Sequence, residues 1–508
     1  MANGETTRGS RAAKLDVAQR TGAGDMAPHT FRAAAHEVVD LMADYLEGVE
    51  ARPVLVDTNP ATLRAALAAG TPELPAPLSE ILADYQRVVV PNATHWQHPG
   101  FFAYFPTTAS GPGILGEMLI AALAQNPMIW RASPVGTAME ELVVGWLRDA
   151  LGLPAAFDGL LTDTASTSTL IALAAAREAA GLDAAALGLA GRPDLGQPRV
   201  YASAEAHSSI DKACMTLGLG RAGLVRIPAD ERFALQVPAL RAAIADDRAA
   251  GRHPIAVVAT IGTTSSTSVD PVAAIADVAR DERLWLHVDA AYAGAAALLP
   301  ECRHLFAGWE RADSVVVNPH KWLFTPVDAS LLLTRRMADL RAAFSLVPEY
   351  LRPPSGASDG RDYSDYTPQL GRRFRALKLW LELRWFGLDG LRRRIARHIE
   401  LAGELRSWVD ADPDWQRLAP VPFSTVCLRH RPRALAGRED EPDVRAELDA
   451  RNTAILEAVN ATGEAFLSHT RLADRFTIRM AVGNLHTEAR HVARAWELLR
   501  REAAHLGT

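Results

Sequence analysis

One lysine of the sequence lies in surroundings that favour amine chemistry. Lys321 follows the apolar run SVVVNPH and precedes Trp-Leu-Phe. Loss of hydration in such a setting disfavours the ammonium form, so more of the side chain is the free amine that attacks carbonyl groups. A surface lysine at the end of a strand would give the same local pattern. The interpretation therefore depends on which other residues the fold brings to this lysine.

Partners for a Schiff-base lysine can be sought separately. Such a lysine usually binds pyridoxal phosphate, which needs an acid at its ring nitrogen and a partner on its ring face. Asp289 ends the apolar run LWLHVD, and Ala291 behind it would let a flat ring lie close. His207, in AEAHSSIDKA, could stack on the ring. Taken singly, the aspartate is also typical of a turn and the histidine of a cap or core position.

The same cofactor needs an anion site for its phosphate. The stretch LLTDTASTSTLIALAAARE joins an apolar run to a good helix pattern, and backbone N–H groups at a helix start attract anions. Thr164, Ala165 and Ser166 would lie at that start, and Asn318 in the lysine motif is a further donor. Serine and threonine at this position are often simple N-caps, so this pattern is weak by itself.

The elements around these motifs predict an α/β fold. Between about residues 199 and 335, short β-branched runs alternate with helical patterns, which is typical of βαβ units around a mostly parallel sheet. His207, Asp289 and Lys321 follow successive strand candidates, so they should meet at one edge of the sheet, where open α/β sheets bind ligands. The predicted strands are RVYAS, LVRIP, IAVVATIG, WLHVD, SVVVN and SLLLT.

The flanking regions have other patterns. Residues 29–50 place apolar residues at helical spacing and predict an amphipathic helix that needs a partner surface, while the first 27 residues are polar and predict a disordered tail. After about residue 375, arginine-rich helices, strands at FSTVCLRH and RFTIRMAV, and a final helix capped by Thr487 predict a smaller α+β domain.

Composition argues against several classes of function. The 508 residues suggest two or three domains, and a net charge of -6 with no basic run gives no support for nucleic-acid binding. Three cysteines without metal-ligand spacing predict reduced packing residues and no metal site. The longest apolar stretch is interrupted by Glu117, Gln125 and Pro127, so no membrane span is expected. We expect a soluble, cytoplasmic protein.

Taken together, the motifs resemble those of a known family, the group II pyridoxal phosphate-dependent amino acid decarboxylases, and among them the decarboxylases of aromatic amino acids. The resemblance extends from about residue 29 to 500, and the pair NPHKW and HVDAAYAG is its most specific part. The motifs that carry it are THWQHPGFFAYFP at 94–106, RASP at 131–134, AHSS at 206–209, ATIGTT at 259–264, HVDAAYAG at 287–294, NPHKW at 318–322 and LGRRFRALKLW at 370–380.

The resemblance implies an architecture. It predicts the fold-type I, aminotransferase-like arrangement: a large cofactor domain with a mostly parallel seven-stranded sheet, a small α+β C-terminal domain, and an N-terminal segment that wraps the other subunit of a homodimer. The unpartnered helix at 29–50 would then gain its surface. The implied divisions are a disordered tail at 1–27, a dimerisation segment at 28–110, a cofactor domain at 111–377 and a small domain at 378–508.

The resemblance also implies a role for individual residues. Lys321 matches the lysine that binds the cofactor, Asp289 the partner of the pyridine nitrogen, and His207 the histidine on the ring. Ala165, Ser166 and Asn318 match phosphate contacts. Thr263 and His320 match residues beside the cofactor. Aromatic substrates would lie against five residues, some of them reaching across from the second subunit: Trp96, Tyr104, Phe105, Pro106 and Thr107.

One tyrosine decides between two expected reactions. Tyr350 matches a tyrosine on a closing loop that gives a proton to the α-carbon after carbon dioxide leaves, with His207 nearby. Its segment is rich in Gly, Pro, Ser and Asp, as a lid should be. In the related aromatic aldehyde synthases a phenylalanine stands there, and oxygen diverts the reaction to an aldehyde. Tyrosine favours simple decarboxylation to an amine.

The choice of substrate depends on fewer residues. Gly371 matches a position where histidine- and tyrosine-preferring relatives often carry serine, so its missing side chain favours tryptophan, 5-hydroxytryptophan and DOPA. Asn126 and Met128 stand where the animal enzymes have a more aromatic wall. Met128 could adapt to several ring sizes, and Asn126 could bond a ring substituent, so phenylalanine and tyrosine stay open as substrates.

Other functions stay open at this point. One is decarboxylation coupled to oxidation, and another is a decarboxylase for acidic amino acids, although HWQHPGFFAYFP offers no basic group for an acidic side chain. A third is a cofactor-binding scaffold without turnover. The presence of Lys321, Asp289, His207 and Tyr350 together argues against the scaffold, because such a protein has no need of all four.

Overall fold

A seven-stranded sheet forms the centre of the large domain in the computed structural model, which describes residues 15–67, 70–192, 194–346 and 360–506. The strand order is β1-β7-β6-β5-β4-β2-β3. Every strand runs in the same direction except β7, which is antiparallel to both neighbours. The strands are β1 (Asp158–Thr162), β2 (Pro198–Ser203), β3 (Leu224–Ile227), β4 (His253–Thr260), β5 (Trp285–Asp289), β6 (Ser314–Val317) and β7 (Ser330–Thr334).

The sheet is buried on both faces because its strands are apolar at consecutive positions. In β4, Val257 lies in the core on one face and Val258 in the core on the other. This alternation is expected for a strand covered by helices on both sides. The covering helices include α6 (Pro134–Leu151), α10 (Val237–Ala249) and α11 (Val272–Glu282) on one face, and α7 (Ala165–Ala179), α9 (Ser209–Thr216) and α13 (Met337–Phe344) on the other.

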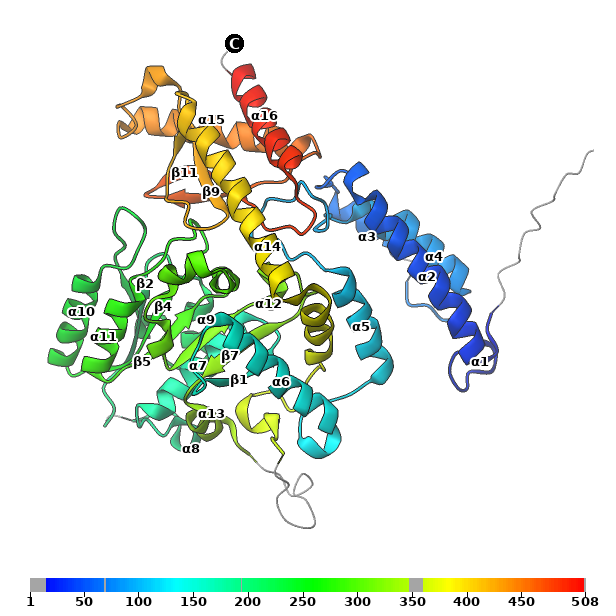
Figure 1. Ribbon diagram of the computed structural model, residues 1–508, viewed down its shortest axis with the longest axis horizontal. Coiled ribbons are helices and arrows are strands. Elements are labelled where there is room, and N and C mark those ends of the chain that lie inside the picture. The colour runs from blue at the N-terminus through cyan, green and yellow to red at the C-terminus, as the bar shows by residue number, and fades with distance from the viewer. Residues whose placement is uncertain (1–14, 68–69, 193, 347–359, 507–508) are drawn as a thin grey trace, which may run out of the picture.

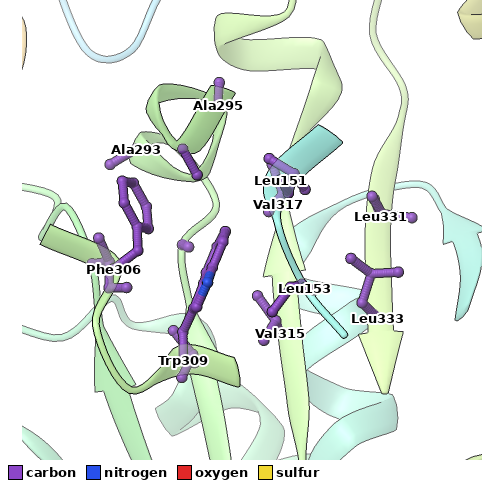
Figure 2. Packing of buried hydrophobic residues seen from close by; sticks show 14 of the residues in the cluster. Leu151, Leu153, Ala293, Ala295, Phe306, Trp309, Val315, Val317, Leu331 and Leu333 are labelled. Atoms are coloured by element: carbon purple, nitrogen blue, oxygen red, sulfur yellow. The ribbon is translucent and has the colours of Figure 1, made fainter. Parts of the chain in front are cut away.

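The larger core lies on the α6, α10 and α11 side of the sheet. There, alternate residues of β6 and β7 point into one cluster. In Figure 2, Val315 and Val317 of β6 lie on the side of Phe306 and Trp309, whereas Leu331 and Leu333 of β7 lie farther from these rings, beyond Leu151 and Leu153. This cluster is called the large-domain core below. The 3₁₀ segments that contribute to it are η6 (Ala293–Leu298), η7 (Pro300–Phe306) and η8 (Trp309–Arg311).

A second, four-stranded antiparallel sheet forms the small domain, with the order β10-β11-β9-β8. Its own core, called the small-domain core, includes Leu405, Val426, Ile478 and Leu498. The elements are β8 (Trp415–Arg417), β9 (Thr425–His430), β10 (Ser468–Leu472) and β11 (Arg475–Ala481), with helices α15 (Pro442–Ala461) and α16 (Ala489–His505).

One long helix, α14 (Ala376–Ala411), contributes to both cores. Leu379, Leu391 and Ile395 pack in the large-domain core, whereas Leu401 and Leu405 pack in the small-domain core. The helix is kinked at Gly387, whose φ of 61° and ψ of 166° are not helical, a backbone conformation that glycine adopts without the strain of a side chain. In Figure 1 the helix runs from the large domain into the small one.

The N-terminal helices extend away from the rest of the chain (Figure 1). Helix α2 (Pro28–Gly48) confirms the helix predicted at 29–50, and none of its residues is buried. Phe31 and Val39 on it are exposed. The other helices before β1 are α1 (Val17–Thr21), α3 (Pro60–Leu67), α4 (Leu78–Asp84) and α5 (Gly111–Leu123). Helix α8 (Ala184–Leu187) lies between α7 and β2, and α12 (Pro319–Trp322) follows β6.

Two local predictions are wrong. Part of the segment predicted as a disordered tail, Val17–Thr21, is helical, because Asp16 and Gln19 form a reciprocal capping box at its start. Thr487 does not cap the last helix. Glu488 is the N-cap and shares a capping box with His491, while the Thr487 hydroxyl donates to Pro99 O at 2.7 Å.

Candidate active site

The carboxyl edge of the large sheet brings together residues from five strands. Because β1, β2, β4, β5 and β6 run in one direction, the segments that follow them lie at the same edge. Thr164 follows β1, His207 follows β2, Thr263 follows β4, Asp289 ends β5, and Lys321 lies in α12 directly after β6. The convergence expected from the sequence is therefore present in the fold.

Lys321 is partly buried and has no carboxylate within ion-pair distance among the described residues. Its Nζ lies 5.1 Å from the centre of the Phe105 ring. Burial lowers the pKa of Lys321, the positive charge of Arg479 lowers it further, and Asp289 opposes both. A larger share of free amine is therefore available at neutral pH than for an ordinary lysine.

Asp289 is held rigidly beside this lysine. It is 5% exposed, and its Oδ1 accepts a hydrogen bond from Ala291 N–H at 3.1 Å. The following turn is tied to the lysine turn, since Asn318 N–H donates to Ala291 O at 2.9 Å and Lys321 N–H donates to Asn318 O at 3.0 Å. The carboxylate and the amine thus occupy neighbouring, mutually fixed turns.

His207 belongs to the same group. Its ring Nδ1 accepts from Ser209 N–H at 3.1 Å, and the residue is otherwise exposed. Burial of the ring edge lowers the pKa of His207, with Lys321 lowering it further and Asp289 raising it. The lowered pKa favours the neutral imidazole, and the exposed residue is available to a ligand.

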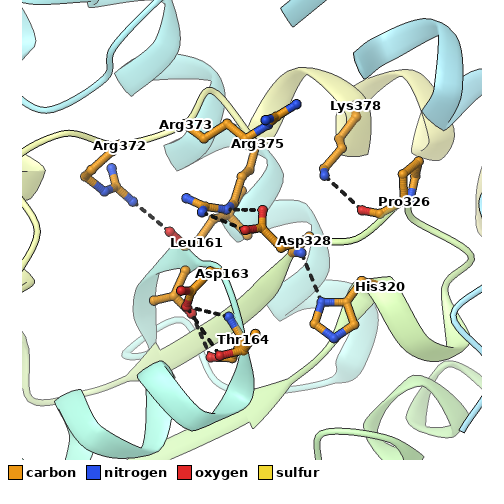
Figure 3. A network of polar contacts seen from close by, with 12 residues as sticks. Leu161, Asp163, Thr164, His320, Pro326, Asp328, Arg372, Arg373, Arg375 and Lys378 are labelled. Carbon is orange, nitrogen blue, oxygen red and sulfur yellow. Dashed lines mark hydrogen bonds and ion pairs between the residues drawn. The ribbon is translucent and has the colours of Figure 1, made fainter. Parts of the chain in front are cut away.

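The start of α7 has the features of the anion site predicted from the sequence. Thr164 is the N-cap of this 15-residue helix and accepts from Thr167 N–H, while Ala165 and Ser166 form its first turn. The Thr164 N–H itself donates to Asp163 Oδ1 at 2.6 Å (Figure 3). Ser166 is exposed, so its hydroxyl and the free N–H groups of the first turn are accessible to an anion.

The side chain of Asn318 supplies a further donor. His320 Nδ1 accepts from Ala329 N–H at 3.0 Å, and burial lowers the pKa of His320 to about 4, so its neutral ring carries the proton on Nε2. Nε2 contacts the Asn318 amide at 3.3 Å, and only an amide oxygen can accept there. The opposite amide atom, which is buried and has no partner, is then the N–H₂ group. This donor is free for a ligand.

Thr263 is completely buried in the turn after β4, and it has a structural role there. Its Oγ1 accepts from Ser268 N–H at 3.0 Å and contacts Ser266 Oγ at the same distance. The threonine therefore fixes the turn at the carboxyl edge of the sheet. Its own contact with a cofactor remains a prediction.

Aromatic side chains form the wall beside the lysine. Phe105 stacks on Tyr292 with ring centres 3.8 Å apart, and Tyr292 stacks on Trp322 at 4.6 Å. Trp322 donates through Nε1 to His398 Nδ1 at 2.9 Å. This column of parallel rings joins Phe105 to α14 through the large-domain core, so the position of Phe105 is tightly fixed.

The remaining residues of this segment lie next to Phe105. Trp96 and Tyr104 are exposed and stack on each other with centres 5.9 Å apart. Pro106 is buried and Thr107 half-buried. Tyr104 has a positive φ of 53°, a conformation that costs a non-glycine residue about 1–3 kcal/mol and is often found at functional sites.

Arg479, on β11 of the small domain, is a site residue that the sequence reasoning missed. Its guanidinium lies 4.4 Å from the centre of Phe105, Nε donates to Ser265 O at 2.9 Å, and one terminal N–H₂ group donates to Tyr104 O. The other terminal N–H₂ group is buried and has no partner. An arginine between the apolar residues of RFTIRMAV was the available signal, because a buried strand rarely carries a charge without a function.

A second group of predicted residues lies apart from the lysine. A Cβ on Gly371 would be 3.8 Å from Asn126 Nδ2, and that amide contacts Met128 Sδ at 3.7 Å. Asn126 Oδ1 accepts from Arg372 N–H at 2.8 Å. No contact within the described residues joins this group to Lys321. Tyr350 lies outside the described residues.

Comparisons with known proteins agree on one family. The model described as "Pyridoxal-dependent decarboxylase conserved domain" matches residues 60–431. Aromatic-L-amino-acid decarboxylase of Sus scrofa is 40% identical over 94% of this chain and 96% of its own length. Phenylacetaldehyde synthase of a Rosa hybrid cultivar is 38% identical over 94% of both chains. The crystal structure of Oryza sativa TDC with PLP and tryptamine is 36% identical and has a TM-score of 0.90, covering 95% of this chain and 99% of the other.

Proposed function

Because this chain belongs to the pyridoxal-dependent decarboxylase family, we propose that it converts aromatic L-amino acids into arylalkylamines and carbon dioxide. It is a carboxy-lyase that uses pyridoxal phosphate. The observation that carries the proposal is the unpaired Lys321, whose Nζ lies 5.1 Å from the centre of the Phe105 ring and whose pKa is influenced by the nearby Asp289. The likeness to tryptophan decarboxylases supports the aromatic substrate.

The residues present fit the cofactor. The Lys321 amine would hold its aldehyde carbon, Asp289 its ring nitrogen and His207 its ring face. The first turn of α7 and the free Asn318 amide would hold its phosphate, and the small side chain of Ala291 leaves room for the ring. When bound, pyridoxal phosphate supplies an electron sink for the pair of electrons left behind as carbon dioxide departs.

Each of the other steps of the reaction is assigned to a side chain of the site. The lowered pKa of Lys321 provides a neutral amine that can be exchanged for the amine of the substrate. The Asp289 side chain would hold the ring nitrogen, and His207 would hold or pass a proton near the α-carbon. We propose Tyr350 as the final proton donor, on the basis of its sequence context PEYL. Thr263 and His320 would hold the turns beside the cofactor.

The substrate ring would lie against the aromatic segment around Phe105. Phe105 is fixed by its stack on Tyr292, while Trp96 and Tyr104 are exposed and can contact a ligand, with Pro106 and Thr107 beside them. We propose that the group of Asn126, Met128 and Gly371 completes this pocket from the second subunit. In support, Gly371 has open space in front of it, with Asn126 as the nearest group.

A homodimer is therefore part of the proposal. Helix α2 has no buried residue and exposes Phe31 and Val39, as expected for a helix that packs on a partner. The division into a dimerisation segment at 28–110, a cofactor domain at 111–377 and a small domain at 378–508 belongs to the same proposal, as does a cytoplasmic location. No helix among the described residues is long and apolar enough to cross a membrane.

The proposal is tested by turnover of the cofactor-loaded protein with tryptophan, DOPA, tyrosine, phenylalanine, histidine and glutamate. Amine, aldehyde and hydrogen peroxide are quantified together. We expect amine from the aromatic substrates without stoichiometric peroxide. Aldehyde and peroxide as the main products would instead support decarboxylation-dependent oxidation, the second candidate, which the likeness to phenylacetaldehyde synthases keeps open. Absence of any product would support a scaffold.

Replacement of Arg479 by methionine is expected to raise KM for the amino acid about 10- to 100-fold. We propose that its unpartnered N–H₂ group donates to the substrate carboxylate, and such a hydrogen bond contributes about 1.5–3 kcal/mol. The measurement pairs KM of the amino acid with the inhibition constant of the product amine, which lacks the carboxylate. Equal weakening of both ligands would show that Arg479 only supports the wall at Tyr104, and Arg479→Lys tests whether charge alone suffices.

A further inference from the structure

Glu382, on α14, is a buried carboxylate beneath the active site. It is 2% exposed, and each of its oxygens accepts from a different hydroxyl: Oε1 from Ser110 Oγ at 2.6 Å and Oε2 from Thr325 Oγ1 at 2.5 Å. A side chain at Gly113 would overlap Oε1. Both oxygens of Glu382 are therefore hydrogen-bonded, and the absence of a side chain at Gly113 leaves the space that Oε1 occupies.

The two hydroxyls belong to the two segments that build the lysine site. Thr325 lies four residues after Lys321, and Ser110 lies five residues after Phe105. The segments also meet directly, since Ser110 N–H donates to Phe324 O at 2.9 Å. Glu382 thus lies at the junction between the loop that carries the amine and the loop that carries the aromatic wall.

The lysine loop needs such support because its backbone is strained. Phe324 has a positive φ of 67° although it is not glycine. Other contacts hold the same loop from α14 and its N-terminal flank: Lys378 Nζ donates to Pro326 O at 2.9 Å, and Arg375 forms an ion pair with Asp328 at 2.9 Å (Figure 3). The Glu382 contact with Thr325 is the one nearest to Lys321 along the chain.

A carboxylate at this position is costly for the fold. Burial raises the pKa of Glu382 to about 7, against the opposing effects of the two hydroxyl donors and of Lys378. Glu117, which is paired with Lys378, raises it as well. Because Glu382 is buried and each of its oxygens accepts a hydrogen bond, moving Ser110 or Thr325 away would leave a buried polar group unpaired. The buried group therefore favours one arrangement of these two residues.

We propose that Glu382 is a positioning residue, which fixes the Lys321 loop relative to the Phe105 segment through Thr325 and Ser110. It touches neither substrate nor cofactor and acts through these two hydroxyls. The inference rests on the proposed function, in which Lys321 is the cofactor lysine and Phe105 contacts the substrate ring.

The test compares holoenzymes of the wild type, Glu382→Gln, Glu382→Leu and Thr325→Val. The readouts are the dissociation constant of pyridoxal phosphate, the pH midpoint of the absorbance change of the cofactor bound to Lys321, and kcat and KM with tryptophan. In Glu382→Leu and Thr325→Val we expect that midpoint to shift by about half a unit or more, and kcat/KM to fall about 10-fold or more, because the loop loses its buried hydrogen bond between Thr325 and Glu382. Glu382→Gln keeps one acceptor and should be intermediate.

A matched control separates positioning from a general loss of stability. Asp247 is also a buried carboxylate, 4% exposed, and accepts from the Tyr201 hydroxyl at 2.7 Å, but it lies on α10 away from the lysine loop. Asp247→Asn should lower the melting temperature and leave the midpoint at its wild-type value. A lower melting temperature together with a wild-type midpoint in all the Glu382 and Thr325 variants would overturn the inference.

Two further outcomes are distinguishable. If Glu382→Leu does not fold, Glu382→Gln and Thr325→Val decide the question, and wild-type midpoints in both would overturn the inference. If borohydride traps no cofactor on Lys321 in the wild type, the proposed function itself fails. If borohydride traps the cofactor on Lys321 in the wild type, but the variants keep the wild-type midpoint and kcat/KM, only the role of Glu382 is refuted.

Discussion

Replacement of Lys321 by alanine is expected to reduce decarboxylation about 10⁴-fold or more, because the reaction loses its covalent anchor for the cofactor and not merely one contact. The chain has only four lysines, Lys14, Lys212, Lys321 and Lys378. Borohydride reduction followed by peptide mapping therefore identifies the modified residue without ambiguity. We expect the adduct on Lys321 in the wild type and no adduct in the variant.

Lys212 provides the control for this substitution. It is exposed on α9, close enough to influence the pKa of His207 but without a partner at the site. Lys212→Ala should keep both the adduct and the activity within a few-fold of the wild type. An adduct that persists in Lys321→Ala, on Lys212 or Lys378, would contradict the assignment of Lys321.

Replacement of Tyr350 by phenylalanine is expected to change the product from amine to aldehyde. Without the phenol the α-carbon is protonated about 10²–10⁴-fold more slowly, which is the usual contribution of a positioned general acid. Oxygen can then take up the electrons left at this carbon and form hydrogen peroxide, and hydrolysis with water releases the aldehyde and ammonia. The measurement is the ratio of amine to aldehyde, together with peroxide, during turnover of one aromatic substrate.

Tyr366→Phe is the matched control, since Tyr366 is half-buried and follows the same segment of the chain. Its product should remain the amine. A Tyr350→Phe variant that still forms amine at the wild-type rate and yields no peroxide would assign the proton transfer to another group, for which His207 is a candidate among the described residues. Loss of all products would instead indicate a role in binding.

The sequence was sufficient to predict the position of the candidate site residues at the ends of strands in the large sheet. Asp289 ends an apolar run, and His207 and Lys321 each follow one closely, so the common direction of parallel strands brings these positions to one edge. The roles assigned to them came from the resemblance of NPHKW and HVDAAYAG to a family. Strands with clear β-branched runs, such as IAVVATIG, were predicted for the same reason.

Features that depend on packing between distant segments could not be predicted. Arg479 comes to the lysine only because the small domain docks against Phe105, which no local pattern encodes. Glu382 is one acidic residue within an ordinary helical pattern, and only the fold reveals its hydroxyl partners. The prediction of Thr487 as the N-cap was wrong because the side chain of Glu488, one residue later, forms the capping box. The short edge strand SHTRL alternates polar residues and gave no strand signal.

Helix α14 has a consequence for how the protein unfolds. The segment after Gly387 places Leu391 and Ile395 in the large-domain core and Leu401 and Leu405 in the small-domain core, so neither core is complete without the same helix. Unfolding of this segment as a whole removes buried surface from both cores, which couples their melting in spite of their separate sheets. The column from Phe105 to His398 ends on this helix as well. The catalytic wall is thus expected to be lost only when the two domains unfold together, as a single cooperative unit.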